Sequence, residues 1–250
     1  MRPLLLAALL VLPLLQGCAH GASSKAMKTA EIHHDLAVEA LRRGQPQDAM
    51  REYDLALESD PDMPEAHHGR GLVLELGFGR LREAEAEYRR AIELKPAFSE
   101  AQNSLGQLLA KSGRYDEALR SFDGALESTF YREPWVARCN KGLTLHRMGR
   151  RDEGYADLRN CLSIAPRFCF GRRELGRLLL GEGKTKEALV ELERYATDCA
   201  SAADAHYQLG LGRMKAGDLP GAREQFERCE TLAGADAPGE ECRKSRLLLE

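Results

Sequence analysis

Aromatic side chains, long apolar runs and blocks of basic residues are all scarce in this sequence of 250 residues. Aromatics make up 6% of the chain, and the longest apolar run, residues 4–15, is too short to span a bilayer. The 36 basic residues are scattered among 39 acidic ones, so the chain lacks the basic patch of a nucleic-acid-binding protein. No Cys-x-x-Cys spacing occurs, which argues against a zinc site or thioredoxin-like chemistry.

Catalytic signatures are missing as well. The chain contains no H-E-x-x-H, no G-x-S-x-G and no Walker glycine loop. Acidic and basic residues alternate along the expected helices, as is typical of solvated helix faces. The sequence therefore predicts a protein that is not an enzyme, needs no cofactor or metal, and binds no nucleic acid.

The first residues are typical of a secretory leader. A basic start at Arg2 is followed by the apolar run and then by Leu15-Gln16-Gly17-Cys18. This junction resembles the bacterial lipobox, in which the Cys thiol is acylated and the chain is cleaved before it. We predict a signal peptide over 1–17 and lipidation at Cys18, with an ordinary signal peptide as the alternative.

The residues after the junction predict where the protein goes. Several acyl chains on Cys18 would bury many methylenes, at about 0.8 kcal/mol each, and so give a stable anchor. Ala19 replaces the Asp that retains bacterial lipoproteins at the inner membrane. We therefore expect an outer-membrane location facing the periplasm, with small and polar residues 18–29 forming a flexible tether.

An internal repeat dominates the rest of the chain. Ala49, Tyr53 and Pro61 recur 35 residues later as Ala84, Tyr88 and Pro96, within the pattern of the tetratricopeptide repeat. The small residue at repeat position 8 is Ala37, Gly71, Gly106, Gly142, Gly176 or Gly210. The small residue at position 20 is Ala49, Ala84, Ala118, Gly154, Ala188 or Ala222, and the bulky residue at position 24 is Tyr53, Tyr88, Phe122, Leu158, Leu192 or Phe226.

This pattern has a direct physical meaning. Two antiparallel helices approach closely only where the touching positions are small, and bulky residues fill the space beside the contact. Glycine near position 15 allows a short reversal, and proline at the end of the second helix stops it. One hairpin cannot bury its apolar face alone, so neighbouring hairpins must stack.

The sequence therefore predicts an all-α, right-handed α-solenoid of six tetratricopeptide helix-turn-helix repeats over residues 30–236. The repeats are expected to start near residues 30, 64, 99, 135, 169 and 203. One extra residue falls at 76–79, and two more fall at 128–134, where Phe130 replaces the terminal proline and indicates an irregularity or hinge. Residues 237–250 are predicted to form the polar capping helix that a solenoid needs.

Six of the seven cysteines lie in repeats four to six, and the predicted extracytoplasmic location permits disulfides. In a hairpin of this length, positions whose numbers sum to about 32 face each other. This rule pairs Cys139 with Cys161 and Cys169 with Cys199, and leaves Cys229 to join Cys242 in the cap. The alternatives are a Cys161–Cys169 bridge across the turn between repeats, or buried free thiols.

Two histidine pairs occupy equivalent positions in the first two repeats. His33-His34 and His67-His68 both fall at positions 4 and 5. A stacked set could hold a metal, but we favour amphipathic rings, with one histidine of each pair packing and the other facing the concave surface.

The first helix of each repeat is expected to line a concave groove at positions 2, 5, 9, 12 and 13. The predicted partner-binding residues of repeats one to three are His34, Val38, Leu41, His68, Leu72, Leu76, Asn103 and Gln107. Val38, Leu41, Leu72 and Leu76 would form an apolar strip, and an apolar patch on a soluble surface suggests a protein partner. Burial of the strip by curvature or in a homodimer is the alternative.

Three parts of the sequence are more specific than the general repeat motif. They are Cys139-Asn140-Lys141-Gly142 with Cys161, Glu174-Leu175-Gly176, and residues 188–195 (ALVELERY). With these motifs, residues 18–232 resemble the type IV pilus pilotins, the PilF/PilW group with its Tgl-like members. The resemblance implies a lipoprotein that binds secretin subunits and promotes their insertion and oligomerisation in the outer membrane. The alternative is a periplasmic scaffold for another envelope complex, such as one for cell-wall synthesis.

Overall fold

The structure, a computed structural model, describes residues 22–234 and 237–249, and these residues form helices and connecting turns without strands. The first three repeats contain α1 (Ser24–Arg42), α2 (Pro46–Ser59), α3 (Pro64–Leu72), η1 (Val73–Gly77), α4 (Leu81–Leu94), α5 (Ser99–Lys111) and α6 (Tyr115–Glu127). The last three and the cap contain α7 (Pro134–Arg147), α8 (Arg151–Ile164), α9 (Cys169–Gly181), α10 (Thr185–Asp198), α11 (Ala203–Lys215), α12 (Leu219–Ala233) and α13 (Ala237–Leu247).

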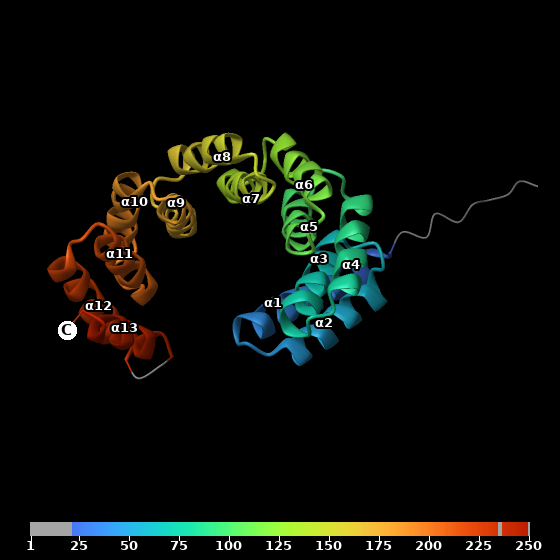
Figure 1. The fold of residues 1–250 in the computed structure, drawn as a ribbon. Helices are drawn as coiled ribbons and strands as arrows, with labels where there is room; N and C mark the ends of the chain where they lie inside the picture. Colours follow the sequence, from blue (N-terminus) through green and yellow to red (C-terminus); the bar gives the residue numbers. More distant parts are fainter. Residues whose placement is uncertain (1–21, 235–236, 250) are drawn as a thin grey trace, which may run out of the picture.

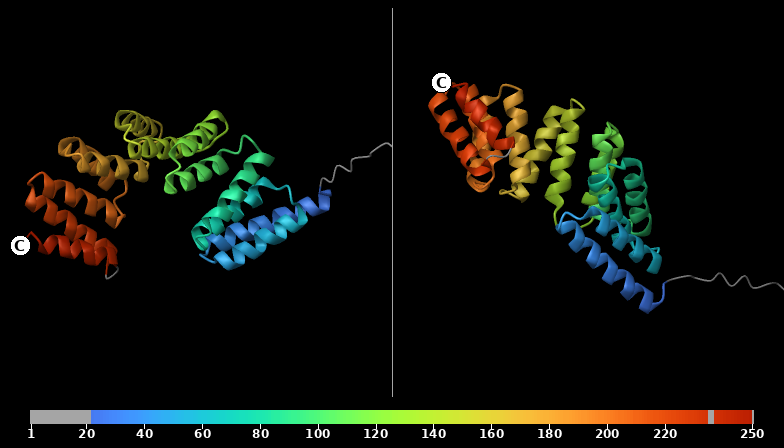
Figure 2. Two further views of the ribbon diagram at one scale, coloured as in Figure 1. Left: turned by 45° about the vertical axis from the view of Figure 1, so that its right-hand side comes forward. Right: turned by 90° about the horizontal axis from the view of Figure 1, so that it is seen from below.

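The helices form six antiparallel hairpins that follow one another along an open arc (Figure 1). Helices α5, α7, α9 and α11 lie on the inner side of the arc, and α6, α8 and α10 lie on its outer side. Figure 2 shows the same succession from two other directions, with the first and last hairpins at opposite ends. The all-α solenoid of six hairpins and a cap is thus confirmed.

The repeat positions pack as their sizes require. The bulky residues at position 24 are at most 2% exposed: Tyr53, Tyr88, Phe122, Leu158, Leu192 and Phe226. In repeats two to six each lies against the glycine at position 8 of its own repeat; a Cβ added at Gly176, for example, would sit 2.5 Å from Leu192 Cδ2. The hairpins therefore close only because position 8 is small.

The inserted residue of the second repeat lengthens its first helix. α3 runs into the π-helical turn η1, so the extra residue lies within Val73–Gly77 and the predicted site at 76–79 is partly wrong. A single π turn is the usual way for an α-helix to absorb one added residue. The helix reversal then follows at Gly79, whose φ of +66° matches the turn glycines of the other repeats.

The first helix starts earlier than predicted. α1 begins at Ser24, and the Ser23 hydroxyl caps it by accepting a hydrogen bond of 3.2 Å from the Ala26 amide. The flexible tether predicted over 18–29 is therefore wrong for residues 24–29, which form the first turns of α1. Serine at the N-cap satisfies an amide that a helix end otherwise leaves unpaired.

The remaining irregular segments are local. Residues 128–133 form a non-helical connection between α6 and α7, in which Phe130 is 92% exposed while Tyr131 packs against the core. The cap α13 packs on α12. Cys18 and the predicted signal peptide lie outside the described residues, and no helix within the described ranges is long and apolar enough to cross a membrane.

Candidate partner-binding groove

The second histidine of each pair packs on the tyrosine of its own repeat. His34 lies edge-on to Tyr53, with ring centroids 5.9 Å apart. His68 packs between Tyr88 and Phe98, and its Nε2 lies 3.0 Å from Ser104 Oγ on α5. Burial lowers the pKa of His68 to about 4, so the ring is neutral at pH 7 and links α3 to α5.

Acidification should therefore weaken this part of the solenoid. Because the folded-state pKa of His68 lies below its unfolded value, the unfolded chain takes up the proton first as the pH falls below about 6.5, and stability is lost between about pH 6.5 and 4. We expect a loss on the order of 2–3 kcal/mol from this one residue. Urea unfolding at pH 7 and pH 4.5, followed by circular dichroism, measures it.

The matched comparison is between two variants at the same repeat position. His68→Gln keeps a polar group near Ser104 but does not titrate, so its acid-induced loss should be smaller than that of the wild type. His34→Gln leaves the His68–Ser104 contact in place and removes only a neighbouring charge that adds to the lowering of the His68 pKa, so it should retain most of the wild-type pH dependence. Equal acid sensitivity in the wild type and His68→Gln would rule out His68 as the group responsible.

The predicted apolar strip is less exposed than its position in the repeat suggests. Leu41 and Leu72 are half-buried and pack against the hydrophobic cores of their hairpins, whereas Leu76 is 73% exposed. Val38 is half-buried. A charge at Leu72 is therefore expected to disturb folding, because Leu72 packs against the core that contains Tyr88.

Asn103 is a buried residue that joins two repeats. Its side chain is 8% exposed, and its Oδ1 accepts a hydrogen bond of 3.0 Å from Asn140 Nδ2, which joins α5 to α7. Such a buried amide pair costs free energy if either partner is lost. Gln107, another predicted groove residue, lines a hollow on the inner side of the arc.

Two hollows lie between the inner helices. The α5–α7 hollow has a volume of about 320 Å³ and is lined by residues of α5, α6, α7 and α9, among them Gln107, Lys111, Asn140, Leu143, Arg147 and Phe170. The α9–α11 hollow has a volume of about 550 Å³ and is lined by Arg177, Leu180, Gly181, Gln208, Leu211, Met214 and Lys215. Both combine apolar walls with a few polar groups, as ligand-binding pockets do.

A buried carboxylate fixes one edge of the first hollow. Glu75 accepts hydrogen bonds from Tyr88 Oη (2.9 Å) and from Lys111 Nζ (2.6 Å), and only 6% of its side chain is exposed. Lys111 therefore ties α5 to η1 of the preceding repeat.

A polar pair that the sequence did not predict recurs within the repeats. Position 4 of the first helix bonds position 23 of the second: His33 Nδ1 to Glu52 (2.8 Å), His67 Nδ1 to Glu87 (2.7 Å) and Arg138 to Asp157 (3.3 Å). Arg172–Glu191 and His206–Gln225 continue the series in repeats five and six. Burial alone would lower the pKa of His67, but the Glu87 carboxylate and the Pro61 carbonyl raise it above its usual value.

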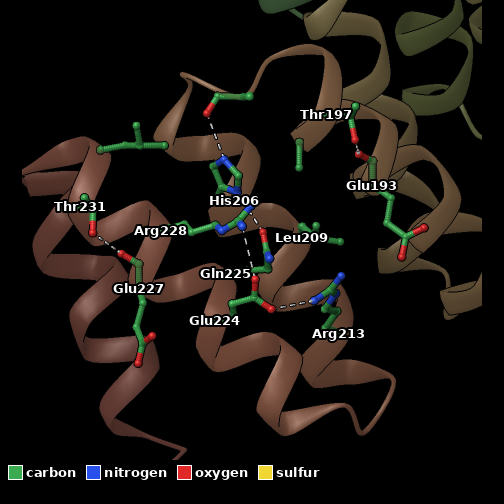
Figure 3. A pocket seen from close by; sticks show the side chains of 13 residues that line it. Glu193, Thr197, His206, Leu209, Arg213, Glu224, Gln225, Glu227, Arg228 and Thr231 are labelled. Carbon is green, nitrogen blue, oxygen red and sulfur yellow. Dashed lines mark hydrogen bonds and ion pairs between the residues drawn. The ribbon is translucent and has the colours of Figure 1, made fainter.

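The largest hollow, about 1060 Å³, lies between α10, α11 and α12 (Figure 3). Its polar groups are largely engaged with one another: His206 with Gln225 at 2.9 Å, and Arg213 and Arg228 with Glu224 at 3.9 and 3.5 Å. A hollow between α4, α5 and α6 has Gln102 and Leu105 at the positions of His206 and Leu209. Because the same furrow recurs, it follows from the stacking of hairpins.

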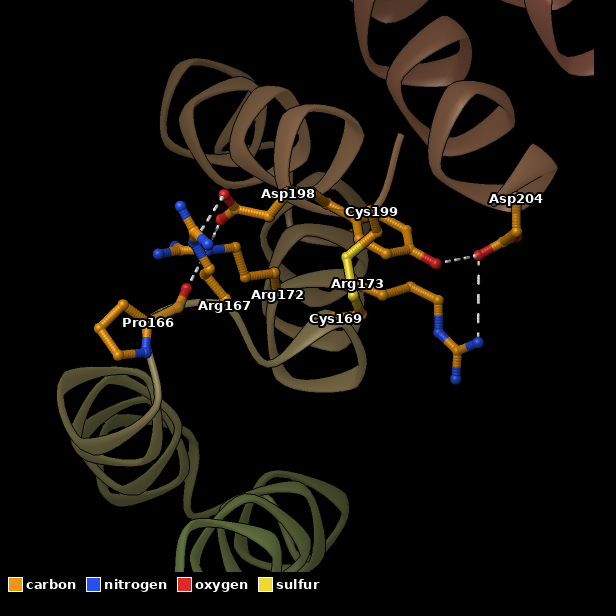
Figure 4. Close-up of a disulfide and its surroundings, with 9 residues drawn as sticks. Pro166, Arg167, Cys169, Arg172, Arg173, Asp198, Cys199 and Asp204 are labelled. Carbon is orange, nitrogen blue, oxygen red and sulfur yellow. Dashed lines mark hydrogen bonds and ion pairs between the residues drawn. A yellow bond between two sulfur atoms is a disulfide. The ribbon is translucent and has the colours of Figure 1, made fainter. Parts of the chain in front are cut away.

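Three disulfides hold the second half of the chain. They join Cys139 to Cys161, Cys169 to Cys199 and Cys229 to Cys242, with Cα–Cα distances of 5.4, 6.1 and 6.0 Å. The first two are the pairs that the facing positions of the hairpins predict, and the third joins the two cysteines that this rule leaves over. Figure 4 shows the second bridge between the start of α9 and the end of α10, beside Arg172 and Asp198.

Family models for the tetratricopeptide repeat match residues 34–77, 74–130 and 137–168, which together exceed half of the chain. The chain belongs to the tetratricopeptide repeat family. Proteins of this family generally mediate contacts between proteins, and their fold typically serves as a scaffold.

Relatives in other proteins share the repeats only in part. DnaJ homolog subfamily C member 3 of Bos taurus is 36% identical over 108 residues, 43% of this chain and 21% of that protein. The Gallus gallus protein of the same name is 26% identical over 230 residues, 87% of this chain and 44% of that protein. The chain thus spans from a fifth to less than half of the length of these relatives.

Two solved structures match along nearly their whole length. PilW, a type IV pilus biogenesis factor, aligns with a TM-score of 0.75 at 24% identity, over 85% of this chain and 97% of PilW. Pseudomonas aeruginosa PilF aligns with a TM-score of 0.72 at 20% identity, over 88% of this chain and 99% of PilF. The resemblance to this group is confirmed at the level of the fold.

Proposed function

We propose that the chain is an outer-membrane lipoprotein of the pilotin type, which binds secretin subunits and promotes their insertion and oligomerisation for type IV pilus biogenesis. The observation that carries the proposal is the match between 85% of this chain and 97% of PilW, at a TM-score of 0.75. A match along nearly the whole length of both chains indicates surfaces of similar extent, which a few matched repeats would not. The lipobox-like Leu15-Gln16-Gly17-Cys18 supports it independently.

A groove on a membrane-anchored scaffold suits the binding of secretin subunits before they insert. A secretin subunit exposes apolar surface before it inserts, and a reversible cover must combine apolar contacts with polar groups that fix orientation. The hollows on the inner side of α5 to α11 offer Leu143, Phe170, Leu211 and Met214 beside amides and cations. An anchor at Cys18 would hold this surface at the membrane where insertion takes place.

Deleting the gene should strongly reduce secretin multimers in the outer membrane, and the wild-type gene should restore them. Cys18→Ala should not restore them, because it removes the acylated thiol and leaves the protein soluble or unprocessed. The measurements are immunoblots of unheated membrane fractions for the secretin, and of soluble and membrane fractions for this protein. Cys18 lies outside the described residues, and the circular dichroism spectrum of Cys18→Ala serves as the control for folding.

Two results would count against the proposal. Normal secretin multimers in the deletion strain would show that the chain serves another envelope complex. A Cys18→Ala protein that still fractionates with the outer membrane would show that Cys18 is not the anchor.

A further inference from the structure

The sign of the charges on the inner surface differs from that of the chain as a whole. The net charge is −3, yet the α5–α7 and α9–α11 hollows contain four cations, Lys111, Arg147, Arg177 and Lys215, and no carboxylate lines either one. The large outer hollow, by contrast, is lined by three glutamates and two arginines. The charged side chains that line these two hollows are therefore all cations.

The partners of these cations separate those that support the fold from those that remain available. Lys111 is neutralised by Glu75, and Arg177 lies 3.5 Å from Glu174, which also accepts a hydrogen bond from Arg173. The Arg147 side chain has no hydrogen-bond or ion-pair partner among the described residues. Lys215 donates only to the uncharged Leu180 carbonyl, at 2.6 Å.

Arg147 and Lys215 stand at position 13 of repeats four and six, so they occupy the same edge of the inner surface two repeats apart. Apolar side chains line the same two hollows: Leu143 and Phe170 with Arg147, and Leu180, Leu211 and Met214 with Lys215. Gln107 and Asn140 add amides to the first hollow. Amides and an unpaired guanidinium in one hollow suit a carboxylate, which a planar guanidinium can bind through two parallel hydrogen bonds.

We propose that the inner surface of repeats three to six binds an extended acidic segment of the partner protein, in which Asp or Glu residues alternate with apolar ones. Carboxylates of the segment bind Arg147 and Lys215, and its apolar side chains enter the two hollows. In an extended chain alternate residues point to opposite sides, so acidic and apolar groups are presented at regular intervals. The inference rests on the proposed function, since it names the chemistry of the partner.

The neighbouring apolar walls favour a peptide over a nucleic acid. A nucleic acid would meet two uncompensated cations on a chain of negative net charge, whereas sequence-independent phosphate binding relies on many. Leu180, Leu211 and Met214 in the α9–α11 hollow are aliphatic, and the aromatic residues of the α5–α7 hollow are Phe170 and the fully buried Phe122. Successive bases would therefore find few aromatic platforms on which to stack.

Selection from a random peptide library displayed on phage tests the chemistry without a known partner. The bait is the full chain, purified in detergent with its disulfides intact. Retained peptides should be enriched in Asp, Glu and large apolar residues relative to the unselected library. A synthetic peptide of the selected consensus should then bind in isothermal titration calorimetry, more weakly as salt is raised.

Variants locate the binding. Arg147→Glu and Lys215→Glu should each weaken the consensus peptide by about tenfold or more, since each replaces an attraction by a repulsion. Arg228→Glu is the matched control, because Arg228 lines the outer hollow with Glu224, and it should leave peptide affinity unchanged. Circular dichroism of each variant checks the fold.

Several outcomes would overturn the inference. They are a library that yields no peptides, peptides without acidic enrichment, acidic peptides that bind Arg147→Glu as well as the wild type, or a single-stranded oligonucleotide that displaces the peptide with equal affinity. These results are separable from a failure of the proposed function. Normal secretin multimers in the deletion strain, together with Arg147-dependent acidic peptides, would leave the groove chemistry intact and assign it to another partner.

Discussion

Reduction of the three disulfides is expected to unfold repeats four to six and the cap at temperatures where repeats one to three remain folded. The bridges close loops of 22, 30 and 13 residues, and all six cysteines lie at or beyond Cys139. Restricting the unfolded chain in this way stabilises a protein by about 3 kcal/mol for each loop of this size. Repeats one to three contain no cysteine and lose nothing directly.

Hydrogen exchange read by mass spectrometry resolves the two halves. In dithiothreitol, peptides from α7 to α13 should exchange much faster, whereas peptides from α3 to α5 should change little. Thermal unfolding followed by circular dichroism should broaden or split into two transitions, since a repeat array loses cooperativity when one part is weakened. A uniform change along the chain would contradict the expectation that stabilisation is local.

Paired substitutions separate the contributions of individual bridges. Cys139→Ala with Cys161→Ala removes two fully buried sulfurs, so it should cost more than Cys169→Ala with Cys199→Ala, where Cys169 is exposed. Mass spectrometry of non-reduced peptides identifies the pairs and excludes or reveals a Cys161–Cys169 bridge. Six alkylatable thiols in protein isolated from the periplasm would show that the three disulfides do not form there.

Gly154→Val is expected to destabilise the fourth repeat by about 3 kcal/mol or more. A Cβ at Gly154 would lie 2.7 Å from the Gly142 carbonyl oxygen and 2.9 Å from the His146 amide nitrogen, which are backbone atoms of α7. Backbone atoms cannot rotate away, so α7 and α8 would have to separate. The Cys139–Cys161 bridge, with Cα atoms 5.4 Å apart, opposes this separation.

The matched control is a glycine whose neighbour can move. A Cβ at Gly176 would meet the Leu192 side chain, so Gly176→Ala should cost less than Gly154→Ala, although the other five repeats carry alanine at the position of Gly154. Urea unfolding of the two alanine variants and of Gly154→Val gives the three free energies. Equal costs for Gly154→Ala and Gly176→Ala would mean that α7 and α8 are no closer than other helix pairs.

What the sequence determined by itself was the repeating unit. Small residues at positions 8 and 20, a bulky residue at position 24 and glycine at the turn recur at nearly fixed spacing, and each acts within its own hairpin. Pairing rules such as Cys139 with Cys161 follow from the same spacing, because helix lengths fix which positions face each other. The residues that fold a hairpin therefore lie within a single repeat, and their recurrence in the other repeats confirms the pattern.

Some features within a hairpin were hidden because residue types vary while the geometry does not. The pairs His67–Glu87, Arg138–Asp157 and His206–Gln225 occupy the same two positions with different chemistry, so no single residue type recurs. The early start of α1 depends on the Ser23 cap, which lies outside the repeat pattern. The signal of these pairs in the sequence is that positions 4 and 23 carry complementary polar residues.

Only the tertiary structure decided which groove residues are free to bind. Exposure on the inner surface depends on how each hairpin sits on the next, and contacts such as His68–Ser104 and Asn103–Asn140 join residues 36 and 37 positions apart. These contacts bury side chains that a position number places in the groove. Arg147, by contrast, has no hydrogen-bond or ion-pair partner among the described residues. The reason is physical: the angle between hairpins is set by side-chain packing across the junction, which the repeat periodicity does not specify.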